Sequence, residues 1–575
     1  MDFGWYKLSI RSRKRLSMSF DFETRQSRAP STSSSRPPAF ASPRHPWLLA
    51  LACAAYTFTI LLYQGLQGAP KAAFGGYPDE SSHYISGLLV RDYLLSGFSM
   101  SPLRYAADYY IHVPFFAVGY WPPLFYTAEA LWMILFGFSR PAVLVFIALI
   151  AAASATLLFA CLRDEFGNLA AFGAGFLFLL SPIVLWGSGL VMTDLLVTLL
   201  SFAATLSLAR YLDSARMWPM LAFSVLAAAT ILTKSSGAFL AIVPPLAVLV
   251  SHKLNLVRRF SFWVGPLVVA VLCAPWFLLT RGLITRGYEK YQKPGLMDTL
   301  GQLGLGLLVN LVWLAPLILI GAWRMFRGPR PMPGFAAVCL VQPAAVLVFL
   351  IMAPVGNESR YLTPALPVLM ILAMYGIRAL ADVAPPARRT LVMAGLVVFF
   401  IGSFVALAAY RLDPVPADTL RPIANFVIER NYHSVLVPSD SEGPMIAEIS
   451  EREMDRLAIF LVRPSKLLAQ TDWNGLVYHA IYKTKEETQA LFDQLPLDGL
   501  VVRMNPPEDA AEHEILLRDM ILAFPNRWHL VRSFGDASSS AGYAVYEPVK
   551  LSELSQQDLA DHLRNLLIQN LALLR

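Results

Sequence analysis

Long apolar runs separated by short polar segments dominate the first 411 residues. The runs lie near residues 47–66, 141–162, 169–189, 193–212, 218–233, 237–251, 261–280, 300–323, 335–353, 361–381 and 390–410. A helix needs about 20 apolar residues to cross a bilayer. The pattern therefore predicts a polytopic all-α membrane region of about eleven transmembrane helices.

A further apolar run, 122–138, is close to the lower length limit for a spanning helix. Basic residues favour the cytoplasmic side of a membrane. If residues 122–138 do not span, three basic clusters become cytoplasmic: Lys253 with Arg258 and Arg259, Arg324 with Arg327 and Arg330, and Arg388 with Arg389. We therefore expect 122–138 to be a surface helix within a long first outer loop, residues 67–140, and the C-terminal region to lie on the outer side.

The two ends of the chain differ from this apolar middle. Residues 1–46 carry nine Lys and Arg but three acidic residues, and are rich in Ser and Pro. They are typical of a disordered, basic cytoplasmic N-terminus, and the run that follows is long enough to be an uncleaved anchor. We expect three parts: 1–46, a transmembrane catalytic domain at 47–411, and an accessory domain at 412–575.

The C-terminal region alternates strand-like and helix-like patterns. Short runs rich in Val, Leu, Phe and Tyr predict strands at 434–438, 457–462, 499–503, 528–532 and 543–546. Segments of mixed charge predict helices at 441–455, 484–494 and 509–523. Such alternation is typical of a soluble α/β domain with a partly parallel sheet. No Gly-rich phosphate loop follows any of these predicted strands.

Composition and charge agree with two regions in different environments. Hydrophobic residues make up 56% of the 575-residue chain and charged residues 15%, against about 25% charged in soluble domains. A soluble globular or disordered chain is therefore excluded. The net charge of +7 divides into +16 for residues 1–412 and −9 for the rest. The basic charge thus belongs to the membrane half, and we expect no nucleic-acid partner.

A few charged residues stand at the ends of apolar runs, where charges are costly. With the predicted topology they all face the outer side: Asp79, Glu80, Asp194, Lys234, Glu358 and Arg360. Each has a structural alternative. Asp79 and Asp194 could cap helices, Lys234 could extend to the interface, Arg360 could simply pair with Glu358, and His83 could be a packed helix residue. It is the joint arrangement that indicates a site.

The chemistry that fits these residues is group transfer from an anionic lipid. A carboxylate in the first outer loop could deprotonate an acceptor. Lys234 and Arg360 could hold a lipid phosphate and stabilise the charge on it as it leaves. The aromatic run from Tyr120 to Tyr126 could bind a sugar or a lipid tail; as an alternative, it is an interfacial aromatic belt.

Five short motifs in this order resemble the membrane glycosyltransferases of the GT-C fold. They are Pro78-Asp79-Glu80, Pro122-Pro123-Leu124-Phe125-Tyr126, Thr193-Asp194, Thr233-Lys234, and Ser359-Arg360-Tyr361 with Pro364-Ala365-Leu366-Pro367. The resemblance covers about residues 47–411. It is closest to the lipid A aminoarabinose transferases and to the dolichyl-phosphate-mannose-protein mannosyltransferases.

The resemblance implies inverting transfer of one sugar from a polyprenyl-phosphate carrier. It implies that Asp79 is the catalytic carboxylate with Glu80 as its acidic neighbour. Lys234 and Arg360, with Tyr361 beside it, match the donor-phosphate site. Asp194 matches a polar contact in the same cavity. We expect His83, Tyr120, Trp121, Tyr126 and Glu358 to contribute to substrate binding.

One departure concerns a metal. Aminoarabinose transferases carry Glu-Lys where this chain has Tyr120-Trp121. The resemblance therefore does not carry metal binding or the aminoarabinose substrate over to this chain. No cofactor is certain, and a divalent metal stays open.

The sequence thus predicts an enzyme of the bacterial inner membrane that transfers a sugar to a lipid, glycan or protein on the outer side. The alternative is a transporter or flippase for lipid-linked sugars. Broken helices and polar groups at the bilayer midplane would favour that alternative.

Overall fold

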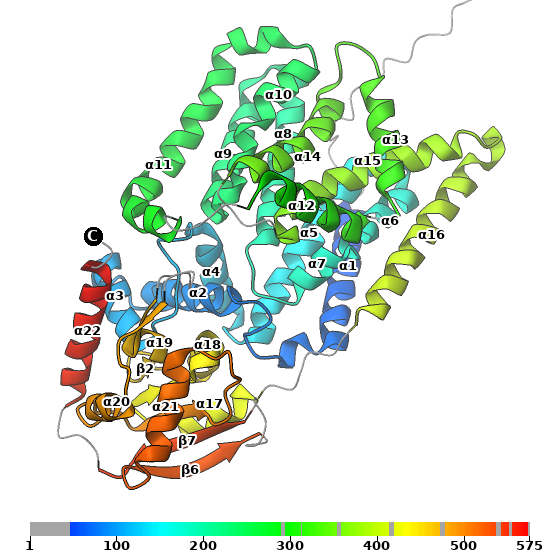
Figure 1. Ribbon diagram of the computed structural model, residues 1–575. Helices are drawn as coiled ribbons and strands as arrows, with labels where there is room; N and C mark the ends of the chain where they lie inside the picture. Colours follow the sequence, from blue (N-terminus) through cyan, green and yellow to red (C-terminus); the bar gives the residue numbers. More distant parts are fainter. Residues whose placement is uncertain are drawn as a thin grey trace, which may run out of the picture. The chain divides into compact units, whose positions relative to one another are not determined.

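A computed structural model describes residues 46–288, 294–311, 313–353, 358–412, 419–471, 478–535, 542–550 and 555–572 (Figure 1). The N-terminal segment predicted as disordered lies outside the described residues, apart from Pro46. The domain boundaries at 46 and 412 stay predictions.

Helices make up the described part of the chain as far as residue 410. They are α1 (Pro46–Gln67), η1 (Ala69–Lys71), α2 (Glu80–Leu95), α3 (Pro102–His112), α4 (Leu124–Phe136), α5 (Arg140–Phe166), α6 (Asn168–Leu179), α7 (Pro182–Ser188), α8 (Asp194–Ser214), α9 (Met217–Thr233), η2 (Ser235–Ala241), α10 (Val243–Val250), η3 (Leu254–Arg258), α11 (Phe260–Tyr288), α12 (Leu296–Leu311), α13 (Ala315–Phe326), α14 (Gly334–Met352), η4 (Ser359–Ala365), α15 (Leu366–Ala381), η5 (Pro386–Arg388) and α16 (Arg389–Tyr410).

The chain is a multi-pass membrane protein, but the predicted count of eleven spans is not confirmed. Among the described residues, seven helices are long and apolar enough to cross a membrane, or up to nine if each of two bent helix pairs is one span. The predicted spans at 218–233 and 237–251 correspond to shorter apolar helices, Met217–Thr233 and Ser235–Val250. The predicted surface helix is α4, another short apolar helix.

The apolar run 169–189 is one of these bent pairs. Helix α6 ends at Leu179 and α7 starts at Pro182, with a bend of 66° between them. Proline has no N–H for the helical hydrogen bond, so it favours the first turn of a new helix. The Asn310 side chain accepts a hydrogen bond from the Ile183 N–H at 2.8 Å. A polar side chain from α12 thus satisfies one of the amide groups that the break exposes.

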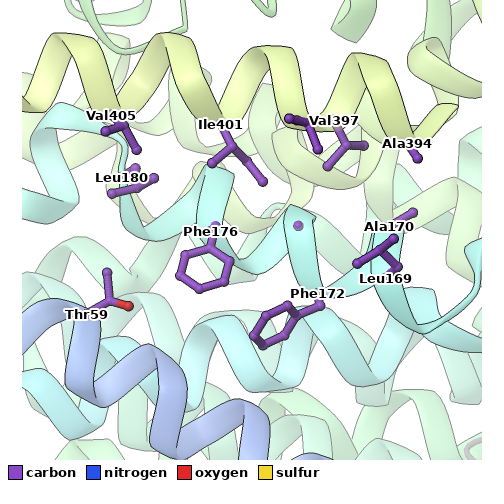
Figure 2. A pocket seen from close by; sticks show the side chains of 12 residues that line it. Thr59, Leu169, Ala170, Phe172, Phe176, Leu180, Ala394, Val397, Ile401 and Val405 are labelled. Atoms are coloured by element: carbon purple, nitrogen blue, oxygen red, sulfur yellow. The ribbon is translucent and has the colours of Figure 1, made fainter. Parts of the chain in front are cut away.

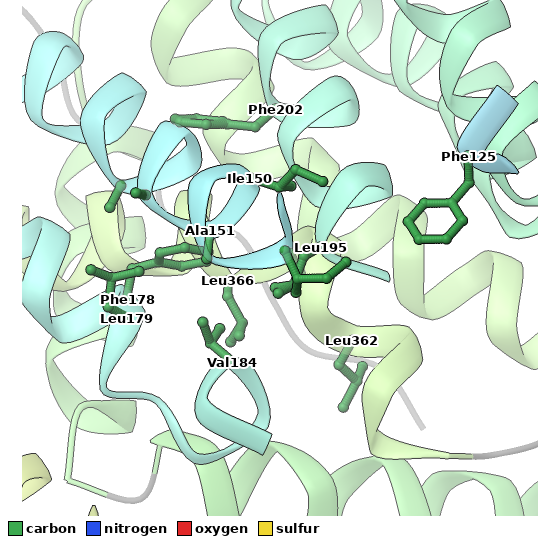
Figure 3. Close-up of a cluster of buried hydrophobic side chains, with 14 of the residues drawn as sticks. Phe125, Ile150, Ala151, Phe178, Leu179, Val184, Leu195, Phe202, Leu362 and Leu366 are labelled. Atoms are coloured by element: carbon green, nitrogen blue, oxygen red, sulfur yellow. The ribbon is translucent and has the colours of Figure 1, made fainter. Parts of the chain in front are cut away.

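Apolar side chains from many helices form one continuous core in the bundle. Figure 3 shows part of it, with labelled side chains that include Ile150 of α5, Leu195 and Phe202 of α8, and Leu366 of α15. Helices α13 and α15 approach each other closely. A Cβ on Gly321 would lie 1.9 Å from the Leu372 carbonyl oxygen, and one on Gly376 would lie 2.0 Å from the Leu317 carbonyl oxygen.

An apolar cavity of about 340 Å³ lies between α1, α6 and α16 (Figure 2). Thr59 contributes its one hydroxyl, which donates to the Ala55 carbonyl of its own helix at 2.9 Å. The cavity therefore offers no free polar group to a sugar or a phosphate, and the functional site has to be sought elsewhere.

The C-terminal region contains the sheet that the sequence predicts. Its elements are α17 (Leu420–Glu429), β1 (Ser434–Leu436), η6 (Ser439–Ser441), α18 (Glu442–Arg452), β2 (Phe460–Val462), α19 (Pro464–Leu467), β3 (Ala469–Thr471), β4 (Tyr478–Ala480), α20 (Lys485–Phe492), β5 (Gly499–Arg503), α21 (Glu512–Ala523), β6 (Trp528–Phe534), β7 (Tyr543–Pro548) and α22 (Gln556–Ala572).

The main sheet has the strand order β2-β1-β5-β7-β6. Strand β1 pairs in parallel with β2 and β5, whereas β7 pairs antiparallel with β5 and β6. The predicted partly parallel sheet is therefore confirmed. The small β3-β4 hairpin was not predicted.

Alternating residues of the central strands face two different cores. Val435 of β1 and Val501 of β5 belong to the same apolar cluster as the helix bundle. Leu436 and Val502, one residue further along each strand, belong to a second cluster with α20 and α21. Successive side chains in a strand point to opposite faces. Both faces of the sheet are therefore buried, and one of them continues the core of the bundle.

Candidate active site

Two Lys–Asp ion pairs mark the two ends of α8. At its start, Lys234 Nζ lies 2.7 Å from Asp194 Oδ1. Near its other end, Lys253 Nζ lies 2.7 Å from Asp213 Oδ1. The two acids are 19 positions apart, which is about 28 Å along a helix. They therefore lie toward opposite sides of the membrane, and only the first pair belongs to the predicted site.

Asp194 is not the N-cap of α8. Thr193 occupies the cap position, and Asp194 lies in the first turn. Its Oδ1 accepts from Lys234, and its buried Oδ2 has no hydrogen-bond partner. The capping alternative for Asp194 is therefore wrong, and one carboxylate oxygen is available for a further contact.

Asp79 stands at the N-cap position of α2, but its side chain makes no capping hydrogen bond. Instead, Asp79 Oδ2 accepts from Arg360 Nη2 at 2.9 Å. This contact joins residues that are 281 positions apart in the chain. The carboxylate therefore faces the predicted phosphate site.

Arg360 is the centre of the cluster. Its side chain is 6% exposed and also pairs with Glu358, whose Oε2 lies 2.8 Å from Arg360 Nε. The Arg360 Nη1 atom is buried without a hydrogen-bond partner. The guanidinium thus keeps a donor that could bind an anion.

Tyr361 brings the two cations together. Lys234 Nζ lies 4.6 Å from the centre of its ring, and Arg360 Cζ lies 5.2 Å from it. An aromatic face stabilises a cation at such distances. A single phosphate is small enough to contact two cations that share one ring, so the predicted donor-phosphate residues lie close enough to act together.

Tyr77 is a member of the site that the sequence did not single out. Its hydroxyl donates to Glu358 Oε2 at 2.5 Å, and Arg360 Cζ lies 4.3 Å from the centre of its ring. Burial and the bond to Glu358 raise the pKa of Tyr77 above its usual value. It therefore stays protonated and acts as a hydrogen-bond donor at neutral pH. Its position directly before the motif Pro78-Asp79-Glu80 was the available signal.

Glu80 makes a separate set of contacts. It is fully buried, and its Oε1 forms an ion pair with Arg140 Nη2 at 2.6 Å. Its oxygens also accept from the backbone N–H groups of Gly76 at 3.2 Å and Val191 at 3.3 Å. These contacts favour a structural role for Glu80, and its predicted catalytic role stays a prediction.

His83 packs against the aromatic run. The His83 ring stacks on Trp121 with 4.3 Å between centroids, and its Nδ1 is 2.9 Å from the Tyr126 hydroxyl. Burial, followed by the positive charges of Lys234 and Arg360, lowers the pKa of His83 well below its usual value. His83 is therefore a neutral, packed helix residue at physiological pH.

Tyr120 is half-buried in the turn that precedes α4, where its N–H donates to the Ala117 carbonyl at 3.1 Å. Tyr126 is fully buried. The predicted substrate contacts of Tyr120, Trp121 and Tyr126 stay predictions.

A metal site is not apparent in the part of the chain that the structure describes. No group of three or more His, Cys, Asp or Glu side chains in those residues could hold a metal ion. In the cluster around Arg360 each carboxylate is paired with a cation, and the donor left without a partner, Arg360 Nη1, suits an anionic ligand.

Comparisons with known proteins agree with this picture. Residues 121–278 match the family model of the dolichyl-phosphate-mannose-protein mannosyltransferases. No curated protein sequence matches the chain.

Two structures of ArnT from Cupriavidus metallidurans share the fold of this chain. The undecaprenyl-phosphate-bound form has 15% identity and a TM-score of 0.56, over 89% of this chain and 100% of that one. The apo form has 16% identity and a TM-score of 0.57, over 87% of this chain and 97% of that one. A mycobacterial arabinofuranosyltransferase, AftD, aligns with 16% identity and a TM-score of 0.48, over 89% of this chain and 42% of that one. The predicted resemblance is confirmed: the chain has the GT-C fold of ArnT, and residues 121–278 resemble the dolichyl-phosphate-mannose-protein mannosyltransferases.

Proposed function

We propose that this protein is an inner-membrane glycosyltransferase that moves one sugar from a polyprenyl-phosphate carrier to a lipid, glycan or protein acceptor. The observation that carries the proposal is the direct contact between Arg360 and Asp79, with Lys234 beside the same tyrosine ring. A candidate base and two candidate phosphate ligands thus meet at one place. ArnT, which shares the fold, binds undecaprenyl phosphate in one of its structures.

In the proposed reaction, Lys234 and Arg360 hold the phosphate of the donor. As the bond between the sugar carbon and the phosphate oxygen breaks, negative charge grows on that oxygen, and the two cations stabilise it. Asp79 takes the proton of the acceptor hydroxyl or amine as the acceptor attacks the same carbon. Asp194 fixes the position of Lys234, and Glu358 with Tyr77 fixes that of Arg360.

Attack with inversion places the acceptor and the leaving phosphate on opposite faces of the sugar. The base must therefore lie on the face away from Arg360. Asp79 Oδ2 and Arg360 Nη2 are 2.9 Å apart, so a bound sugar has to separate the two side chains. In this proposal the donor phosphate replaces Asp79 as the partner of Arg360, and Asp79 becomes free to act as the base.

The proposed orientation has the N-terminus in the cytoplasm and the C-terminal region outside. Arg456 of the C-terminal region pairs with Asp92 of α2 at 3.1 Å. This contact supports the proposed topology, in which the C-terminal region and the first loop share the outer side.

The transporter alternative also has an observation in its favour, namely the 66° break between α6 and α7. Broken helices are common in transporters, where they surround a site at the bilayer midplane. Here, however, the charged cluster lies at the start of α8 and the end of α9. This position favours chemistry at the membrane surface.

The test is transfer by the purified protein in lipid vesicles, with a set of synthetic undecaprenyl-phosphate sugars and a membrane extract as the acceptor source. We expect release of undecaprenyl phosphate from one donor. A general base contributes about 10²- to 10⁴-fold, so Asp79→Asn should lower kcat by at least about 100-fold.

The matched control is Asp164→Asn. The Asp164 side chain is 60% exposed and lies near the C-terminal end of α5. It should turn over like the wild type. Near-normal turnover by Asp79→Asn would remove the base assignment. Passage of intact donor across the vesicle membrane without any transfer would favour the transporter.

A further inference from the structure

Arg140 connects three segments around the candidate site. It is 1% exposed at the start of α5. Its Nη2 pairs with Glu80 at 2.6 Å and donates to the Gly189 carbonyl at 3.3 Å, and its Nη1 donates to the Ala69 carbonyl. One buried guanidinium thus joins the beginning of α2, the segment before α8 and the segment after α1.

Two of these segments carry the candidate site residues. Glu80 is adjacent to Asp79 in the chain, and it also accepts from the Val191 N–H, three residues before Asp194. A shift of the Arg140–Glu80 pair would therefore change the position of Asp79 relative to Asp194 and its partner Lys234.

The C-terminal region also contacts Arg140, through the backbone of this residue. The Arg140 backbone N–H donates to Glu451 Oε1 at 2.6 Å. Arg140 is the first residue of α5, and the N–H groups of a first helical turn have no partner within the helix. A carboxylate is a favoured partner at this positive end of a helix. Glu451 comes from α18, so the contact fixes the start of α5 to the C-terminal region.

A second contact between the C-terminal region and this part of the chain involves Phe138, two residues before Arg140. The guanidinium groups of Arg91 of α2 and Arg456 of the C-terminal region both lie over the Phe138 ring, at 4.5 Å and 4.8 Å from its centre. The Tyr84 hydroxyl of α2 donates to the Phe138 carbonyl at 2.6 Å. Residues 138–140 are thus held between α2 and the C-terminal region.

We propose that Arg140 is a positioning residue for sugar transfer, and that Glu451 of the C-terminal region keeps it in place. This inference rests on the proposed function. It gives the C-terminal region a defined task, which is to fix the candidate base relative to the phosphate site.

The test uses the full chain in lipid nanodiscs with Glu451→Ala, because removing the buried Arg140 side chain could prevent folding. Hydrogen–deuterium exchange measures the exchange rates of the backbone amides in residues 76–83 and 189–194. The amides of α13 serve as an internal reference. Kinetics with a transferable undecaprenyl-phosphate sugar separate kcat from KM. The matched control is Glu429→Ala, which removes the same charge from an exposed site in α17.

For Glu451→Ala we expect faster exchange in both segments and unchanged exchange in α13. We also expect kcat to fall about tenfold, since small displacements of reacting groups have effects of at least this size. KM should change less than kcat, because Arg360 and Lys234 themselves lie on η4 and at the end of α9, outside the two segments. Glu451→Gln should recover part of kcat, because its amide oxygen can still accept from the Arg140 N–H.

Unchanged exchange and kcat in Glu451→Ala would overturn the proposal. So would faster exchange throughout the protein, which would indicate a general loss of stability, or faster local exchange without a change in kcat. A wild-type protein that transfers no sugar would count against the proposed function instead. The exchange data would then still decide whether Glu451 holds the two segments.

Discussion

Asp79 and Arg360 neutralise each other in the structure, and this has a consequence for ligand binding. The Asp79 side chain is 28% exposed and that of Arg360 is 6% exposed. A phosphate that binds Arg360 has to compete with the Asp79 carboxylate. Partly exposed ion pairs contribute about 1 kcal/mol at most.

Asp79→Asn should therefore bind undecaprenyl phosphate about fivefold more tightly than the wild type, while its transfer activity is lost. Titration of the purified variant with undecaprenyl phosphate, followed by native mass spectrometry, measures the affinity. Weaker binding by Asp79→Asn would show that the carboxylate does not compete for Arg360.

His83 should make the protein less stable in acid. Because its folded pKa lies below the usual value, the unfolded chain takes up the proton first as the pH falls. The free energy of unfolding is therefore unaffected by His83 above about pH 6.5 and decreases below it.

His83→Gln should thus show a smaller loss of thermal stability between pH 7 and pH 5 than the wild type. Unfolding midpoints of the two proteins in the same detergent, measured across this range, check the difference. Parallel curves would contradict the assignment of a buried neutral His83.

Individual residues show how far the sequence could lead to the site. Charges at the ends of apolar runs are rare, so Asp79, Lys234 and Arg360 could be recognised and assigned to one side of the membrane. Their pairing could not be predicted, because it joins residues from distant segments. Arg140 was missed, although a charge before the apolar run 141–162 was the same kind of signal.

At the scale of elements, apolar runs predicted where helices lie better than where they break. The run 169–189 is continuous in hydropathy, yet Pro182 starts a new helix within it. Hydropathy measures composition and does not register the hydrogen bond that a proline removes. The strands of the C-terminal sheet were found because their residues are β-branched and aromatic and stand between polar helices.

The pair α13 and α15 depends on two glycines that allow backbone contact. Gly376→Ala should destabilise the protein by about 3 kcal/mol, because its Cβ would meet a main-chain carbonyl that cannot rotate away. The matched control is Gly402→Ala in α16, where an added Cβ has no atom within 4 Å. Thermal unfolding in detergent should show a clear decrease for the first variant only. Equal midpoints would contradict the close packing.

At the scale of the whole molecule, the distribution of charge along the chain predicts that the C-terminal region lies on the same side of the membrane as the first loop. The structure adds that the two are in contact, through Asp92 with Arg456 and through Arg140 with Glu451. Charge patterns report the side of a membrane, whereas contacts depend on surface shapes that only the folded chain defines.

The most direct test of the central claim uses the two Lys–Asp pairs of α8. Undecaprenyl phosphate is titrated into the wild type, Lys234→Ala and Lys253→Ala, and the dissociation constants are measured by native mass spectrometry. Charge-assisted hydrogen bonds contribute about 1.5–3 kcal/mol, so Lys234→Ala should weaken binding by about tenfold or more. Lys253→Ala should bind like the wild type, because its pair lies at the opposite end of the helix. Wild-type affinity in Lys234→Ala, or equal weakening in both variants, would contradict a phosphate site at Lys234 and Arg360.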